Sequence, residues 1–436
     1  MEASWLSDIL PKSILSQLSV VKPAIRRSVS LCLLCRGGRG LCGKKSCPVL
    51  LRVQYLAKTS LRITSPEIHG SSPPGVFVGR IGYPKVYVGP MVPPFTGDTA
   101  ILDTPERWLG KELQEIVDYR FALIRGKVRA DVHSTESEFI RQMQELAMGK
   151  SPAESEVVLE RIPKMILTLG SDIQPFGPSA PMKNFHLCSN IYTDWRIEKA
   201  HADKDLRAAE AVIELYERGV MVSAIQRTFS LGMFGLKSQR KLVPTRWSIT
   251  AVDSIISQHL IEKIKEFPTI DEFRVYTFSH MDNRFAAILM PEKKWSFEWI
   301  EAWFPGTTWN PEKIGRPAVM GDYETYEGRT TYPDIGGCYY ACRLAVAESL
   351  ANERRQASAL VMREIHPGYL LPVGVWFVRE CVRKMLSQPP AVFDNFASAL
   401  RHAMSSLTIS LDDWVRASYL LRRSLFQKRI TEFLRK

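Results

Sequence analysis

The chain has 436 residues, of which 45% are hydrophobic and 24% charged, and its net charge is +12. This length and composition exclude disordered and fibrous proteins and predict two or three units with their own cores. The apolar stretch at 370–378 is far shorter than the roughly 18 residues of a membrane span, and the N-terminus lacks the pattern of a signal peptide. We therefore expect a cytoplasmic protein with no membrane partner.

The positive charge lies at the two ends of the chain. Residues 1–60 carry ten Lys or Arg against two acidic residues, and residues 416–436 carry seven against one, so the 355 residues between them are close to neutral. Basic ends can simply keep a protein in solution, or they can bind a polyanion. Two such arms favour DNA as a partner, and with it a nucleoid-associated location.

Four cysteines lie within sixteen residues near the N-terminus. They are Cys32, Cys35, Cys42 and Cys47, which form C-x2-C and C-x4-C pairs among glycine-rich turns. This spacing predicts one tetrahedral structural Zn²⁺ site, and four thiolates leave no open position for a catalytic water. An iron–sulfur cluster and two disulfides remain as alternatives. We expect a small four-cysteine zinc finger within an N-terminal region, residues 1–63.

The other cysteines and several histidines carry no such signal. The scattered cysteines are expected to be buried small apolar residues, and they are Cys188, Cys338, Cys342 and Cys381. Three histidines lack partners at metal-ligand spacing and are expected to be structural or surface residues, and they are His186, His201 and His366. None of them is therefore a candidate metal ligand on the sequence alone.

A body of residues 64–415 follows, and it opens with a linker rich in Pro, Gly and Ser at 64–75. Alternating β-branched residues next predict a hairpin of two strands, at 76–78 and 86–88. Apolar residues at helical spacing then predict four helices with one strand among them. The helices are 108–123, 136–148, 205–218 and 253–267, and the strand is 157–169.

Two polar segments in this half are candidate binding sites. One surrounds the glycine-rich hairpin turns, whose backbone N–H groups can hold phosphate, although tight turns need the same glycines; its residues are Arg80, Lys85, Asp98 and Asp103. The other is RKLVPTRWSITAVDS at 240–254, where Arg246 can pair with phosphate and Trp247 can stack on a base. Asp253 is a candidate catalytic carboxylate, or it caps the following helix.

The second half of the body predicts three strands and then helices. The strands, at 273–278, 285–289 and 295–303, suggest an antiparallel meander. A long irregular segment covers 304–334, and long loops within a body are often functional. The predicted helices are 339–362, 376–386, 392–404 and 411–426. Together these elements indicate an α+β fold, with a mixed body that contains an antiparallel sheet and several helices.

The irregular segment contains a third candidate site, in GDYETYEGRTTYPDIGG. Asp322 and Glu324 are candidate catalytic carboxylates that orient a water or a metal, and Arg329 is a candidate ligand-binding residue. Glycines before the next helix expose N–H groups that can bind a phosphate. The alternative is a solvated acidic loop with a helix cap. No Walker motif, nucleophile elbow or HExxH motif accompanies the segment.

The basic tail, residues 416–436, ends in QKRITEFLRK. Gln427, Ile430, Phe433 and Leu434 match Q-x-x-[aliphatic]-x-x-[aromatic]-[aromatic or aliphatic], which resembles the peptide that binds the sliding clamp, PCNA. On one helical turn the three apolar residues share a face and form a plug, and Gln427 can hydrogen-bond beside it. The alternative is that these residues continue the preceding helix into the core.

Several segments together extend the resemblance to most of the chain. They are the cysteine cluster, GVFVGRIGYPKVYVGPMVPP, RKLVPTRWSITAVDS, GRTTYPDIGGCYYACRLAVAESL, REIHPGYLLPVGVWFVRE and the clamp peptide. The combination resembles the archaeal Nre family of DNA-repair proteins. The resemblance implies a role in the DNA damage response, the clamp peptide at the four tail positions and the finger at the four cysteines. Leu434 stands where a second aromatic residue is commoner.

Two classes of function remain open after the sequence is read. As a binding adaptor, the protein uses its finger and basic ends for DNA and its tail for the clamp, and it recruits other repair factors. As an enzyme, it adds a hydrolysis of DNA or a nucleotide adduct, as a nuclease or as a damaged-base or ADP-ribose glycohydrolase. The pocket of such a hydrolase is expected to combine Arg246, Trp247, Asp253, Asp322, Glu324 and Arg329.

Overall fold

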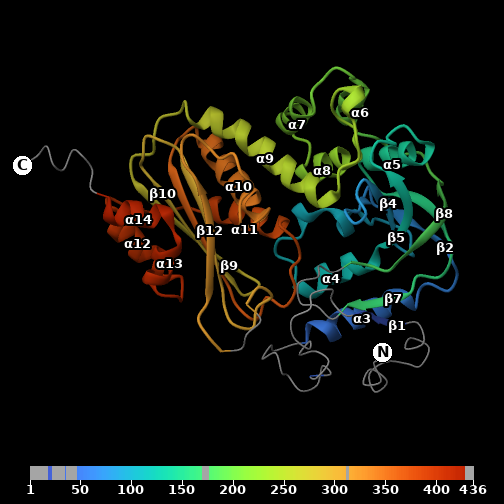
Figure 1. Cartoon of the computed structure of the whole chain (residues 1–436), viewed down its shortest axis with the longest axis horizontal. Helices are drawn as coiled ribbons and strands as arrows, with labels where there is room; N and C mark the ends of the chain where they lie inside the picture. Colours follow the sequence, from blue (N-terminus) through green and yellow to red (C-terminus); the bar gives the residue numbers. More distant parts are fainter. Residues whose placement is uncertain (1–17, 22–34, 36–46, 169–175, 311–313, 428–436) are drawn as a thin grey trace, which may run out of the picture. The chain divides into compact units, whose positions relative to one another are not determined.

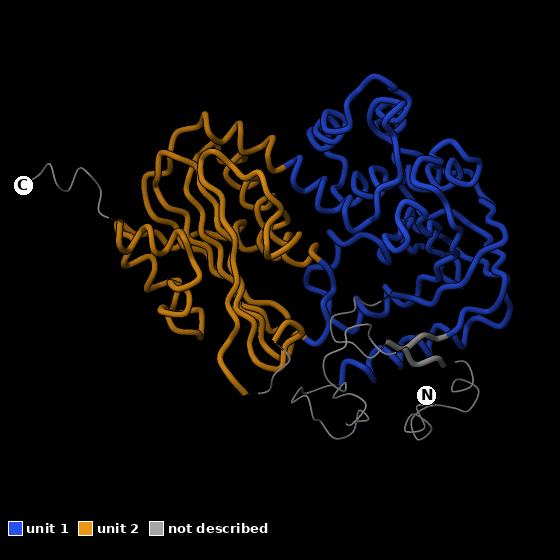
Figure 2. Tube along the Cα trace, viewed as in Figure 1, with its two compact units in different colours: residues 1–256, 370–374 blue, residues 257–369, 375–436 orange. Residues whose placement is uncertain are grey.

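The computed structural model describes residues 18–21, 35, 47–168, 176–310 and 314–427. It divides into two compact units, coloured separately in Figure 2. Unit 1 comprises residues 1–256 and 370–374, and unit 2 comprises residues 257–369 and 375–436. Each unit has a six-stranded sheet with both parallel and antiparallel pairs, so the predicted α+β class is confirmed.

The sheet of unit 1 has the strand order β2-β6-β8-β5-β4-β3. Its strands are β2 (Glu67–Ser72), β3 (Val76–Val78), β4 (Lys85–Val92), β5 (Ile124–Asp131), β6 (Ala153–Leu159) and β8 (Ser179–Leu187). Neighbouring strands are antiparallel except β5 and β8, which are parallel. The predicted hairpin is confirmed as β3 and β4. The predicted strand at 157–169 is in fact split around Pro163, because β7 (Met165–Thr168) pairs with β1 (Leu18–Val21) instead.

Along the chain, the described helices of unit 1 precede, separate and follow these strands (Figure 1). They are α3 (Pro48–Ser60), α4 (Leu113–Ala122), α5 (Glu138–Met148), α6 (Trp195–Ala202), α7 (Ala208–Glu217) and α8 (Val222–Ser230). Short 3₁₀ helices lie at Ala100–Asp103, Pro105–Arg107 and Lys237–Gln239. The long helix α9 (Thr245–Ile264) starts in unit 1 and ends in unit 2. Among the described helices, none combines the length and the apolar character needed to cross a bilayer.

The sheet of unit 2 has the order β12-β11-β13-β10-β9-β14. Its strands are β9 (Phe273–His280), β10 (Asn283–Met290), β11 (Ser296–Trp303), β12 (Ala318–Glu324), β13 (Ser358–Ile365) and β14 (Ala391–Phe393). The predicted meander is therefore wrong beyond its first hairpin, because β13 lies between β10 and β11 and runs parallel to β11. Strand β12 also occupies part of the segment predicted to be irregular.

Strand β13 explains the largest error in the predicted elements, a helix over 339–362. Helix α10 (Cys338–Glu353) ends where Arg354 adopts a left-handed conformation with φ 54°, and the chain then enters β13. All eight residues of β13 are buried. A strand covered on both faces has no alternation of polar and apolar residues, so its apolar run cannot be told from a buried helix.

Helices cover both faces of this sheet, which is why its inner strands are buried. Helices α10 and α11 (Trp376–Leu386) lie on one face, where Phe377 packs near Phe285 and Tyr339 near Phe297. The other face carries α12 (Phe396–Ser405), α13 (Leu411–Ala417) and α14 (Tyr419–Phe426), with Trp414 in the shared core (Figure 1). The predicted helix 376–386 matches α11 at both ends.

The predicted helix 411–426 is broken at Ser418 by a buried carboxylate. Glu298 of β11 accepts hydrogen bonds from the Ser418 hydroxyl and from the backbone N–H groups of Tyr419 and Leu420, at 2.6–2.8 Å. Burial raises the pKa of Glu298, and these hydrogen bonds act in the opposite direction. An acceptor from the sheet thus satisfies the N–H groups at the start of α14, which fixes the last described helix to β11.

Candidate nucleic-acid interface

The turn between β3 and β4 presents an exposed loop on unit 1. The N–H of Gly79 donates to the Tyr87 carbonyl at 2.7 Å, and the N–H of Lys85 donates to the Gly82 carbonyl at 2.9 Å. Gly82 has φ 85°, a conformation that favours glycine, and a Cβ there would lie 2.9 Å from the Lys85 carbonyl oxygen. The glycines therefore fold a tight turn whose other side chains point into solvent.

The start of helix α9 packs against this turn through two contacts. The N–H of Val78 donates to Thr245 Oγ1 at 2.9 Å. The rings of Tyr83 and Trp247 lie 5.4 Å apart between centroids, at an interplanar angle of 49°. Tyr83 is 44% exposed and Trp247 46% exposed. Two segments that are distant in the sequence thus form one exposed aromatic pair, which we call the Tyr83–Trp247 surface.

Cationic side chains belong to the same two segments and to β5. Arg80 and Lys85 of the turn and Arg246 of α9 are all exposed. Arg129 of β5 reaches the turn as well, because a Cβ at Gly82 would lie 3.7 Å from its Nη2. On β5, Asp131 is directly opposite Lys85 of the neighbouring strand β4. Aromatic faces beside several guanidinium and ammonium groups can stack on bases and pair with phosphates.

Of the three residues predicted in segment 240–254, two are exposed on this surface and one is not. Arg246 and Trp247 lie there, whereas Asp253 is fully buried two turns further along α9. The Asp253 carboxylate accepts a hydrogen bond from Gln226 Nε2 at 2.8 Å within unit 1. The other predicted catalytic carboxylates, Asp322 and Glu324, belong to unit 2.

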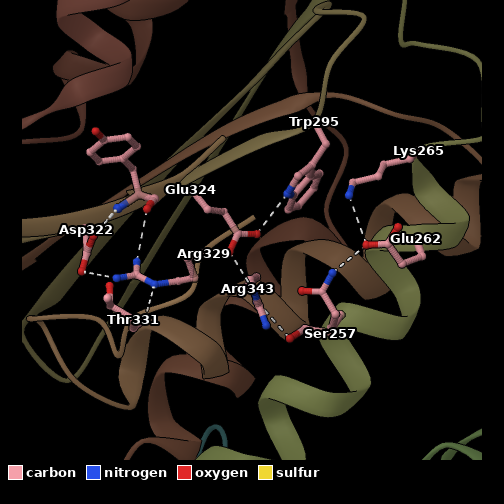
Figure 3. A network of polar contacts seen from close by, with 11 residues as sticks. Ser257, Glu262, Lys265, Trp295, Asp322, Glu324, Arg329, Thr331 and Arg343 are labelled. Carbon is pink, nitrogen blue, oxygen red and sulfur yellow. Dashed lines mark hydrogen bonds and ion pairs between the residues drawn. The ribbon is translucent and has the colours of Figure 1, made fainter. Parts of the chain in front are cut away.

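Glu324 lies at the centre of the buried polar network in Figure 3. One carboxylate oxygen forms an ion pair with Arg343 at 2.7 Å, and the other accepts from Trp295 Nε1 at 3.1 Å. Arg343 in turn donates to Ser257 Oγ at 3.0 Å. The side chains of Arg343 and Glu324 are 2% and 1% exposed. Both oxygens of Glu324 thus bind structural partners, and the pair joins β12 to α10.

Asp322 and Arg329 form a second, more exposed cluster at the end of β12 (Figure 3). Asp322 accepts from Arg329 Nη2 at 2.8 Å and from the N–H groups of Tyr323 and Asp334, each at 2.9 Å. Burial acts to raise the pKa of Asp322, but these hydrogen bonds outweigh it and lower the pKa. The remaining Arg329 nitrogens donate to the carbonyls of Thr331 and Tyr323. The structure therefore brings these two predicted residues together as a brace for the loop.

Asp103 is a carboxyl group of unit 1 whose surroundings raise its pKa. Burial raises its pKa to about 6, although the nearby Arg120 and Arg227 act to lower it. A Cβ at Gly75 would lie 2.4 Å from Asp103 Oδ2, so the carboxyl group lies directly against the backbone before β3. Asp98, which was predicted to lie near the same turns, is exposed and accepts from the N–H of Ala100.

The raised pKa of Asp103 predicts a pH-dependent stability. Because the folded pKa is about 6 and the unfolded value is 3.8, the favourable contribution is complete below about pH 4 and is lost as the pH rises through 6. The side chain of Asp103→Asn stays neutral, so its free energy of unfolding should not fall in this way. Between pH 4 and pH 7 the variant should become more stable than the wild type by up to about 3 kcal/mol. Urea unfolding at several pH values measures the difference.

The control for this experiment is Asp205→Asn, because Asp205 is an exposed carboxylate of the same unit. Its unfolding free energy should follow that of the wild type at every pH. If the free-energy difference between Asp103→Asn and the wild type were the same at pH 4.5 and pH 7.5, the carboxyl group of Asp103 would not be the group that titrates.

The predicted zinc and clamp residues are described only in part. Cys32 and Cys42, like Ile430, Phe433 and Leu434, lie outside the described residues. Of the remaining finger cysteines, Cys35 is buried, and Cys47 is the N-cap of α3, where its sulfur accepts from the N–H of Leu50 at 3.5 Å. Gln427 is the C-cap of α14.

Tyr83 is the residue of the Tyr83–Trp247 surface that sequence reasoning did not single out. The predicted phosphate site in the same turn was built from its charged residues and its glycines. An aromatic residue in a glycine-rich turn is a usable signal in itself, because a tyrosine in such a turn is seldom needed for the turn and is exposed to solvent. Its partner Trp247 was predicted from the other segment alone.

Comparison with known proteins identifies relatives along most of the chain. Residues 41–310 match the family described as archaeal Nre, N-terminal, and residues 324–433 match archaeal Nre, C-terminal. The DNA repair protein NreB of Archaeoglobus fulgidus is 46% identical and covers 92% of this chain and 100% of its own length. The DNA repair protein NreA of the same organism is 37% identical, over 85% of this chain and 92% of its own.

A third relative comes from another organism. The DNA repair protein NreA of Haloferax volcanii is 35% identical over 81% of this chain and 86% of its own length. No solved structure matches the chain significantly. The relatedness therefore rests on sequence, and both halves of the chain contribute to it.

Proposed function

Because the chain belongs to the archaeal Nre family, we propose that it is a DNA-repair protein of the DNA damage response that binds both DNA and the sliding clamp. Three similar proteins carry the name DNA repair protein. The proposal places the protein in the cytoplasm, associated with the nucleoid, and includes recruitment of other repair factors. Its two contacts are argued separately below.

The observation that carries DNA binding is the contact of Tyr83 with Trp247. An exposed aromatic pair costs solvation and suits a ligand with flat apolar faces, and the neighbouring Arg80, Arg129 and Arg246 suit a ligand with negative charge. Nucleic acid combines the two. Because exposed aromatic rings stack on the faces of unpaired bases, this surface favours single-stranded or locally opened DNA.

Clamp binding rests on the tail sequence and on the way α14 ends. Gln427 follows directly after α14, and Phe426, the last residue of the helix, is 71% exposed. The clamp motif thus begins directly after the last described helix. A motif that follows the last packed helix can enter a groove on a partner without unfolding the core. The basic residues around it suit an acidic rim or nearby DNA.

Zinc completes the proposal at the N-terminus. The position of Cys47 at the start of α3, with its sulfur accepting an N–H, suits a zinc-bound thiolate, and Cys32, Cys35 and Cys42 would provide the other ligands. Such a site would be structural. Its basic neighbours, such as Arg36 and Lys44, would add to the DNA contact.

Binding is favoured over hydrolysis by the contacts of the three predicted catalytic carboxylates. Asp253 accepts from Gln226, Glu324 pairs with Arg343, and Asp322 is held by Arg329. A general acid or base needs a proton that it can exchange with substrate at working pH. The lowered pKa of Asp322 and the buried ion pair of Glu324 both oppose such a role.

The test of the Tyr83–Trp247 surface is Trp247→Ala, measured by fluorescence anisotropy with a labelled single-stranded oligonucleotide. Loss of one stacked base should weaken binding by about 1–3 kcal/mol. Arg246→Ala should instead reduce the slope of log affinity against log salt concentration by about one, the value of one phosphate contact. Equal affinity of wild type and Trp247→Ala at every salt concentration would reject this surface as the DNA contact.

The matched control is Trp195→Ala. Trp195 lies on α6 of the same unit, is 58% exposed and stacks on Arg218 instead. The Trp195→Ala variant also loses an exposed indole, but from another site. It should therefore bind the oligonucleotide as tightly as the wild type does. Circular dichroism of both variants should be unchanged, because neither indole is buried in the core.

A further inference from the structure

One face of the unit 1 sheet brings together three side chains of different chemistry. His69 on β2 is directly opposite Glu156 on β6 in the strand register. Cys188 follows β8, and its N–H donates to the Glu154 carbonyl at 2.8 Å. The ligand atoms of His69, Glu156 and Cys188 all lie within 4.8 Å of one another. Three neighbouring strands thus converge on one point.

The strand register explains why these side chains share a face. Residues directly opposite one another in an antiparallel pair point to the same side of the sheet. His69 and Glu156 are such a pair, and Cys188 continues the row of β8 that opposes Glu154 and Glu156. His69 and Cys188 are exposed and Glu156 is partly exposed. This face of the sheet is therefore open to an ion from solvent.

We propose that His69, Glu156 and Cys188 bind a zinc ion on this face, with water in the fourth position. Imidazole nitrogen, carboxylate oxygen and thiolate sulfur are the ligands that zinc takes in proteins. A thiolate disfavours magnesium and calcium, which take oxygen ligands. Tetrahedral zinc holds its ligand atoms roughly 3.3–3.7 Å apart, so small side-chain rotations within the observed 4.8 Å close the site.

The backbone around the site is held by strand pairing and by backbone hydrogen bonds. His69 and Glu156 lie within paired strands, and the position of Cys188 is fixed by its bond to Glu154. The N–H of Glu154 donates in turn to Ser189 Oγ at 3.0 Å. Because the ligands stand on rigid strands, binding costs little conformational entropy beyond that of the side chains.

His186 is a neighbour of the site and is left out of the ligand set. It stands opposite Glu156 on β8, but its Nε2 lies 2.7 Å from Asn184 Nδ2. Its ring is therefore engaged along β8. With three protein ligands the fourth position falls to solvent, as in zinc sites that can take a water or a substrate atom. This site is separate from the four-cysteine site proposed near the N-terminus, and it does not depend on the proposed DNA contact.

The first experiment counts metal in the full chain by elemental analysis after equilibration with Zn²⁺ and removal of the excess. The wild type should retain one equivalent more than Cys188→Ser and one more than His69→Ala. Glu154→Gln, a neighbouring carboxylate on the same face, is the matched control and should retain as much as the wild type. Cys35→Ser should lose metal from the N-terminal site and keep the equivalent assigned here.

The second experiment measures Cys188 directly, so that a folding defect cannot mimic the result. Iodoacetamide labelling, read for the peptide that contains Cys188, should be slowed at least about tenfold by Zn²⁺ in the wild type, because a metal-bound thiolate is protected. In His69→Ala that protection should be lost while labelling without metal stays the same. Equal zinc content in wild type and Cys188→Ser, or labelling of Cys188 that Zn²⁺ does not slow, would overturn the proposal.

Discussion

Deletion of residues 427–436 is expected to abolish binding of the chain to the purified sliding clamp. Burial of Ile430, Phe433 and Leu434 in a groove should contribute roughly 1.5–3 kcal/mol each. After the cost of ordering the segment, the peptide alone can reach about micromolar affinity. Isothermal titration calorimetry of full-length and truncated chain against the clamp measures the difference. Equal affinity of the two would refute the clamp proposal.

Within the tail, Phe433 should carry the largest share of the binding energy. Phe433→Ala should cost at least about 2 kcal/mol, as aromatic anchors at binding hot spots do. The matched control is Phe426→Ala, which removes an equally aromatic and 71% exposed side chain at the end of α14. Lys428→Ala should mainly change the association rate and its salt dependence. A Phe426→Ala variant as weak as Phe433→Ala would show that the binding residues lie further upstream.

The deletion should leave the fold intact, because contacts that precede the deleted segment hold α14 to unit 2. Its start is held by Glu298, and Leu420 and Leu421 are buried in the core of unit 2. The thermal unfolding midpoint of the truncated chain should therefore stay within the error of the wild-type value. This separates a lost binding motif from a lost domain.

Glu324→Ala is expected to lower the stability of unit 2 by about 3–5 kcal/mol, the largest effect of any single substitution considered. The change leaves the Arg343 guanidinium buried beside an empty position, and it removes the acceptor of Trp295 Nε1. Desolvated charge without its counter-charge is the most costly of these losses. Urea unfolding followed by circular dichroism measures the change.

Two further variants test the cause of this loss. Glu262→Ala removes a 58% exposed carboxylate that pairs with Lys265 in the same region, and it should change stability by less than about 1 kcal/mol (Figure 3). Glu324→Leu combined with Arg343→Met removes both charges and should recover part of the loss. If the double variant were less stable than Glu324→Ala, packing and not the unpaired charge would dominate.

The fold class and most elements could be predicted because their patterns are local. Helix α11 follows from apolar residues at helical spacing between the glycine before it and the prolines after it, and its predicted bounds are the observed ones. The hairpin of β3 and β4 follows from its glycine turn and β-branched residues. The pairing of β13 between β10 and β11 could not be predicted, because strand order is set by contacts between segments far apart in the chain.

The resemblance to the archaeal Nre family is confirmed. Within the candidate site, too, local features could be predicted and tertiary contacts could not. Arg246 and Trp247 were predicted from an aromatic residue among cations, which is a local signal. The contact of Trp247 with Tyr83 is a tertiary contact that the sequence of neither segment predicts. Cys188 was expected to be buried and is exposed instead, because it lies just beyond the end of β8 on the open face of the sheet.

The capping of α14 by Glu298 has a mechanical consequence. The tail is tied, through a short helix, to an interior strand of the unit 2 sheet. The proposed clamp motif runs from Gln427 to Leu434, so even a fully extended motif places its last anchor within about 25 Å of α14, at roughly 3.3–3.6 Å per residue. A clamp bound by the tail would thus stay close to unit 2. A second contact within that distance, such as one with DNA, would form at an effective concentration in the millimolar range. Even a low intrinsic affinity for the DNA inside the clamp would then keep the protein bound to the clamp and DNA together for a long time.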